Sequence, residues 1–366
     1  MGGEDEWLHL FSSNIRELYI ADTIDLLAAP WGFIYQFRYQ EEYVQDEARI
    51  RWHGRKGGLH GCKVVVYYSL QHAANFHPAA YVPLRYGEVV HASVEGKTHV
   101  VQFKLLGYAS LADPKKDQRR DMLVQDFSKK IRDELTPSYP DYADDDGSGL
   151  DKRRSATLGP SPASLIDDSG DEGSKFERVV RYMSDALGPQ QPRLFFRVAS
   201  IWKRHKGKPE KLSDDGYLEI TAGNHYSIEV AHYQTASPGT GSALQISAPK
   251  GTELLTPTEL PLRSRYDVMP VRLFAPFRDD EVQGELTIRV KEPAQGASLR
   301  IPVSITPSTT HAVFSPAFAI FGAFFVVVPA TLGPSAPLEP RLGFAVIGAF
   351  LVTAGALTRR SKGLSA

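Results

Sequence analysis

A glycine-rich basic stretch near the N-terminus has the residue types of an anion-binding site. It reads RIRWHGRKGGLHGCK over 49–63 and combines guanidinium and ammonium groups with one tryptophan. Arginine binds phosphate oxygens in a bidentate geometry, glycines let backbone N–H groups approach an anion, and an exposed indole stacks on a base. The alternative is a solvated loop in which the tryptophan packs inward. The residues predicted to bind an anion or nucleotide here are Arg49, Arg51, Trp52, Arg55, Lys56 and Lys63.

A second basic stretch, IWKRHKGKPEK over 201–211, also places cations beside a tryptophan. Its pattern predicts a loop after a strand. Such a loop would contact anionic lipid, with a binding free energy of about 1 kcal/mol per basic residue near the charged surface. Its other possible partners are a protein, the acidic segment of the chain and a nucleic acid. The alternative is a solubilising loop without a partner. The residues predicted to make this contact are Trp202, Lys203, Arg204, Lys206 and Lys208.

Motifs for catalysis and metal binding are missing from the sequence. It contains no P-loop, HExxH, GxSxG, GxGxxG after a strand, or paired CxxC. His60 and Cys62 are two residues apart, but a metal site needs further ligands that converge on one point. We therefore name no catalytic residue, no metal and no cofactor. A zinc site, a Cys62–His60 pair and an enzyme in the N-terminal domain are kept as alternatives, with a non-enzymatic role favoured.

Charge and cysteine content limit the classes of partner. The 366 residues include 42 Lys+Arg and 43 Asp+Glu, for a formal net charge of −1. A protein that binds long polyanions is expected to be strongly basic, so any nucleic-acid contact would be a local patch. The single cysteine, Cys62, cannot form an internal disulfide, which favours a reducing compartment.

Two uncharged runs near the C-terminus predict a membrane anchor. The runs 312–332 and 342–358 contain no Asp, Glu, Lys or Arg, and the first spans about 31 Å as a helix. Arg359, Arg360 and Lys362 follow at once, so the positive-inside rule places both termini in the cytoplasm. These features predict a protein of the cell inner membrane with two spans. A buried helical hairpin is the alternative.

The remaining chain divides into two predicted domains. Residues 1–135 mix helical and strand patterns, which indicates a small α+β domain around a curved sheet or barrel. Residues 136–174 are rich in Pro, Ser, Gly and Asp, and predict a disordered acidic linker. Residues 175–308 begin with a helix, capped by Ser174 with Glu177, and continue with alternating strands such as GELTIRVKE at 284–292. These strands favour an immunoglobulin-like antiparallel β-sandwich.

The sequence thus predicts a multidomain membrane protein with an N-terminal α+β domain, an immunoglobulin-like sandwich and a C-terminal transmembrane hairpin. The predicted function is a membrane-tethered cytosolic recognition or scaffold protein. Its predicted partners are the lipid bilayer together with a protein or a small anionic ligand; a nucleic acid and a homo-oligomer are further options. One alternative is a sensor–effector whose N-terminal domain binds an anionic ligand while the hairpin acts on the membrane. The other is an enzyme.

Overall fold

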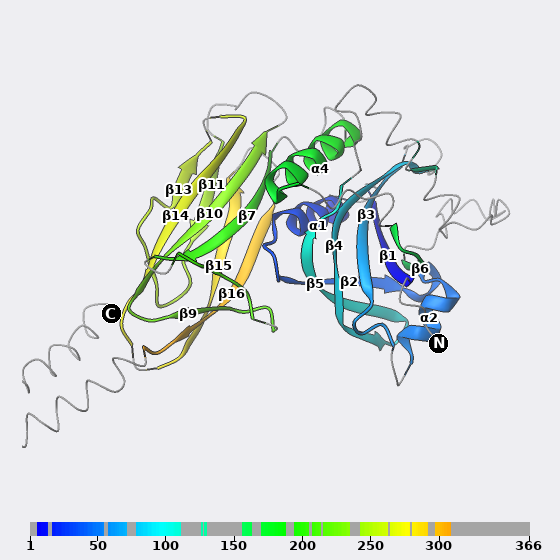
Figure 1. The fold of residues 1–366 in the computed structure, drawn as a ribbon, viewed down its shortest axis with the longest axis horizontal. Coiled ribbons are helices and arrows are strands. Elements are labelled where there is room, and N and C mark those ends of the chain that lie inside the picture. Colours follow the sequence, from blue (N-terminus) through cyan, green and yellow to red (C-terminus); the bar gives the residue numbers. More distant parts are fainter. Residues whose placement is uncertain are drawn as a thin grey trace, which may run out of the picture.

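The computed structural model shows a protein built mainly from β-sheets (Figure 1). Strands account for 58% of the described residues, and three short helices accompany them. The structure describes residues 6–13, 17–54, 58–71, 78–110, 126, 128–129, 156–162, 170–187, 194–204, 207–213, 215–234, 242–262, 264–278, 280–291 and 297–308.

The N-terminal part forms one curved six-stranded sheet with the order β2-β5-β4-β3-β1-β6. The β1–β3 pair is parallel and the other neighbours are antiparallel. Among the described residues β2 and β6 do not pair, so strand pairing does not close a barrel. The strand bounds are β1 (Glu6–Ser13), β2 (Ile34–Gln40), β3 (Lys63–Gln71), β4 (Pro78–Glu95), β5 (Thr98–Tyr108) and β6 (Ala156–Pro160).

The helices are short and pack on the sheets. They are α1 (Glu17–Ala28), α2 (Asp46–Trp52), the 3-10 turn η1 (Glu41–Tyr43) and α4 (Glu172–Leu187). Asp171 caps α4, because its Oδ1 accepts the backbone N–H groups of Gly173 at 2.9 Å and Ser174 at 3.0 Å. The predicted Ser174 cap is therefore three residues too late. Apolar residues of α4, among them Phe176, are fully buried.

The C-terminal part consists of two five-stranded sheets, with the orders β12-β14-β10-β7-β8 and β13-β11-β15-β16-β9. Pairing is antiparallel except between β9 and β16, and the arrangement is consistent with the predicted sandwich. In β15, Leu286 and Ile288 are buried while their neighbours are more exposed, as the alternating sequence predicts. The bounds are β7 (Leu194–Lys203), β8 (Pro209–Glu210), β9 (Leu218–Thr221), β10 (Asn224–Gln234), β11 (Ala243–Ser247), β12 (Glu253–Leu254), β13 (Glu259–Pro261), β14 (Tyr266–Ala275), β15 (Val282–Lys291) and β16 (Ser298–Thr306).

The two parts share one continuous buried core and several polar contacts. Helix α1 packs against β7, and Asp25 on α1 accepts the backbone N–H of Ser298 at 2.6 Å. At the start of α4, Glu172 accepts the backbone N–H of Tyr108 at 3.1 Å. The N-terminal sheet and the sandwich are therefore joined by packing as well as by the chain.

The predicted fold class, a multidomain membrane protein with an α+β N-terminal domain, was wrong. In the described part of the chain no helix is long and apolar enough to cross a bilayer. The helices have 12, 7 and 16 residues, whereas a span needs about 20. An uncharged run of suitable length is a necessary condition for a span and does not establish one. The two-span topology, the inner-membrane localisation and the membrane keywords are therefore withdrawn.

Several predicted segments lie wholly or partly outside the described residues. Both predicted spans, 312–332 and 342–358, are outside them, as is most of the predicted linker 136–174. The part of the linker that is described is ordered: residues 156–160 form β6, which pairs with β1. Composition alone did not reveal this strand.

Candidate functional site

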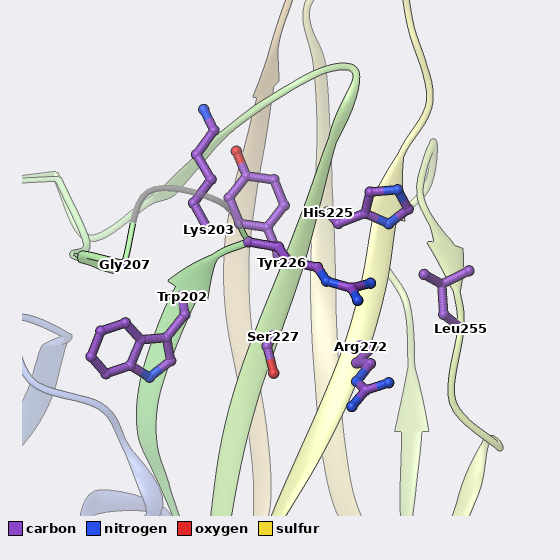
Figure 2. A pocket seen from close by; sticks show the side chains of 9 residues that line it. Trp202, Lys203, Gly207, His225, Tyr226, Ser227, Leu255 and Arg272 are labelled. Carbon is purple, nitrogen blue, oxygen red and sulfur yellow. The ribbon is translucent and has the colours of Figure 1, made fainter.

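A cavity of about 300 Å³ lies at the ends of strands β7 and β10, beside β14 (Figure 2). Its wall combines basic, aromatic and small polar side chains from three neighbouring strands and two adjoining segments. The lining residues are Trp202, Lys203, Arg204, Gly207, His225, Tyr226, Ser227, Leu255 and Arg272.

The register of the sheet brings these side chains together. Ser227 on β10 pairs with Trp202 on β7 and with Arg272 on β14, so the three side chains project from the same face. Figure 2 shows Trp202 on one side of Ser227 and Arg272 on the other. His225 lies two residues along β10 and therefore shares this face. Its carbonyl accepts the backbone N–H of Arg204 at 2.8 Å.

The opposite face of the same strands supplies the rigid base. The neighbours of the site residues, Ile201, Ile228 and Val271, are buried in the core of the sandwich. Apolar and polar side chains alternate along each strand, so one face packs inward and the other is left for the site. Sites on strands are held more precisely than sites on loops.

Three cations of this cavity lack a carboxylate partner. Among the described residues, Lys203, Arg204 and Arg272 form no ion pair, although Lys203 Nζ lies 6.0 Å from the ring centroid of Tyr226. The nearby carboxylate of Glu229 instead accepts a hydrogen bond from Ser200 Oγ at 2.5 Å. Among the described residues, three cations and no carboxylate therefore line the cavity.

The aromatic residues of the cavity are held in place. Trp202 Nε1 donates to Ser200 Oγ, which fixes one edge of the indole. The His225 ring stacks on Phe274 with centroids 4.6 Å apart, and its buried Nδ1 has no partner in the described part of the chain. Burial raises the pKa of Tyr226, so this residue is a neutral phenol.

The second predicted cluster only partly coincides with the cavity. Trp202, Lys203 and Arg204 line it, Lys208 is exposed outside it, and Lys206 lies outside the described residues. The sequence reasoning missed the residues of β10 and β14. Alternation in HYSIEV would have placed His225 and Ser227 on one face, but nothing in the sequence pairs them with a residue about 45 positions away. The missed residues are His225, Tyr226, Ser227, Leu255 and Arg272.

In the first predicted cluster each described cation has an acidic partner. Arg49 pairs with Glu41 at 2.9 Å and Asp46 at 3.1 Å, Arg51 pairs with Glu6, and Lys63 pairs with Glu88 at 3.0 Å. These pairs reduce the positive charge available for an anion. Arg55 and Lys56 lie outside the described residues.

The tryptophan of the first cluster packs inward. Trp52 is buried, its Nε1 donates to the carbonyl of Val100 at 2.9 Å, and its ring meets His99 edge-on at 5.4 Å. An indole in this position offers no free face to a base. An anion site at 49–63 stays a prediction, and the geometry favours the cavity of the sandwich instead.

Groups for metal or thiol chemistry are not assembled in the part of the chain that the structure describes. No three His, Cys, Asp or Glu side chains there are arranged to hold a metal ion. The Cys62 thiol lies 3.4 Å from the carbonyl oxygen of Glu6, and burial raises its pKa. Because the thiolate is the reactive form, Cys62 is a weak nucleophile.

Comparison with known proteins assigns no family to the chain. No protein-family model matches it, and no curated protein does. Among solved structures it shows a weak similarity to the Vibrio cholerae VesB protease, with 9% sequence identity and a TM-score of 0.18. The alignment covers 76% of this chain and 96% of that one. At so low a TM-score the similarity supports no conclusion about fold or function.

Proposed function

We propose that this protein is a recognition protein whose β-sandwich binds a small anion in the cavity formed by β7, β10 and β14. The observation that carries the proposal is that Arg204 and Arg272 line one cavity and form no ion pair among the described residues, with Lys203 lining it from the strand face that carries Tyr226.

Electrostatics favours an anion in such a place. Like charges that share a concave surface repel one another, and a bound anion removes this cost. Hydrogen bonds between guanidinium groups and phosphate or carboxylate oxygens contribute about 1.5–3 kcal/mol each. The cavity volume of about 300 Å³ is at the lower end of small-molecule sites, which suits a small ligand.

Isothermal titration calorimetry of the full-length chain with inorganic pyrophosphate tests the proposal. We expect saturable binding, and we expect Arg204→Gln and Arg272→Gln each to weaken it by about tenfold, equivalent to about 1.4 kcal/mol. The matched control is Arg300→Gln, which removes an exposed arginine of β16 whose only described ion pair, with Glu285, is 3.8 Å long.

Equal affinity of the two cavity variants and the unaltered protein would reject the site. So would the absence of saturable binding to the unaltered protein. Circular dichroism of each variant establishes that the sandwich is folded, so that a loss of binding reports on the cavity.

A further inference from the structure

The cavity contains an aromatic side chain, Trp202, that the binding of an anion alone does not require. Trp202 is half-buried, and its Nε1 is tethered to Ser200 on the same strand. A tethered indole loses little freedom when a flat ring stacks on it. Stacking on an aromatic side chain is the usual way in which proteins hold a nucleobase.

The spacing of the wall suits a ligand with a ring at one end and an anion at the other. Trp202 and Arg272 are on strands to either side of β10, so about 10 Å separates their backbones. A ligand that contacts both side chains therefore spans the width of β10. Ser227 lies between them in the same row, and its hydroxyl can bond to a polar group in the middle of the ligand.

His225 supplies a further polar group without a partner. Its Nδ1 is buried and unpaired among the described residues, although the ring itself is fixed by stacking on Phe274. A buried polar atom without a hydrogen bond is costly, so His225 has hydrogen-bonding capacity that no described residue uses.

Two acidic residues lie on the face of the sheet that carries the cavity. Glu253 on β12 pairs with Phe274, and Glu229 follows Ser227 by two residues on β10. A long polyanion would run over these carboxylates. Among the described residues, these carboxylates interrupt the positive region on this face, which suits a compact anion better than a long polyanion.

From these observations we infer that the cavity takes a mononucleotide, with its base on Trp202 and its phosphate between Arg204 and Arg272. This inference rests on the proposed anion site and specifies its ligand. Ser227 and His225 then face the sugar and the polar edge of the base.

Calorimetry of the full-length chain with common ribonucleoside monophosphates, the matching nucleosides and inorganic phosphate tests the assignment. We expect at least one monophosphate to bind about tenfold more tightly than either its nucleoside or phosphate. Trp202→Leu should abolish this advantage while phosphate binding is retained, and Trp202→Phe, which keeps a ring, should preserve part of it. Trp31→Leu, at an exposed tryptophan outside the cavity, is the control.

Three results would overturn the inference. If phosphate binds as tightly as every monophosphate, the nucleotide assignment fails and the anion site stands. If a single-stranded oligonucleotide binds more tightly than the monophosphates, the ligand is not compact. If neither phosphate nor any nucleotide binds, both the inference and the proposed function fail.

Discussion

Asp25 gives the contact between helix α1 and strand β16 a dependence on pH. Its carboxylate accepts the backbone N–H of Ser298, and it interacts electrostatically with Asp22 and Tyr35. Burial raises the pKa of Asp25 from 3.8 to about 7, and the Coulomb repulsion from Asp22 adds to this effect. The hydrogen bond from Ser298 opposes the shift without cancelling it.

The sign of the effect follows from proton binding. Between the unfolded value of 3.8 and the folded value of about 7, the folded protein retains a proton that the unfolded chain releases. The free energy of unfolding therefore falls as pH rises through this window. At about 1.4 kcal/mol per pKa unit the full shift corresponds to about 4 kcal/mol, and solvent screening at this half-buried group reduces our expectation to about 2 kcal/mol.

Denaturant unfolding at roughly pH 5 and pH 8 measures this term. We expect the unaltered protein to lose about 1 kcal/mol more between the two conditions than Asp25→Asn, because pH 5 already lies above the unfolded pKa and the amide does not titrate. Asp215→Asn, at an exposed residue of the sandwich, should behave like the unaltered protein. If Asp25→Asn and the unaltered protein have the same pH profile, the reasoning about this contact is refuted.

Two further predictions concern buried contacts. Arg85 is fully buried, and its guanidinium donates to two backbone carbonyls at 3.0 and 2.9 Å and lies 4.0 Å from the ring of Tyr108. Arg85→Met removes a buried donor from both carbonyls, so chemical denaturation should show a loss of about 3 kcal/mol; a loss below about 1 kcal/mol would contradict this. Gly223 has a φ of +81° and a Cβ there would overlap the ring of Phe277, so Gly223→Ala should cost more than Gly96→Ala, by about 1–2 kcal/mol. Equal losses at the two glycines would show that the ring moves aside freely.

The sandwich was predictable from the sequence because each strand carries its own signal. Leu286 and Ile288 alternate with polar residues, and this period of two requires no knowledge of the partner strand. Helix α4 was also predictable, because its apolar residues recur at helical spacing within a single segment. Its start was misplaced because Asp171 and Ser174 are both good caps, and only the three-dimensional structure shows which side chain accepts the N–H groups.

The candidate site depended on pairings that the sequence does not contain. Arg51 on α2 pairs with Glu6 on β1, and Lys63 pairs with Glu88 on the neighbouring strand β4, which compensates these charges of the first basic cluster. In the sandwich the register brings Arg272 next to Ser227, and no described acidic side chain lines the cavity with it. Local composition therefore identified both basic clusters. It could not show in which of them the cations lack ion pairs in the folded protein.

The most direct test of the anion site is the indole N–H spectrum of protein labelled with ¹⁵N only at tryptophan. The chain has four tryptophans, and Trp202→Phe assigns the signal of the residue in the cavity. The account predicts that pyrophosphate shifts the Trp202 signal saturably and leaves that of Trp52, which is bonded to Val100 in the other sheet, unchanged. A Trp202 signal that stays still under saturating pyrophosphate would contradict it.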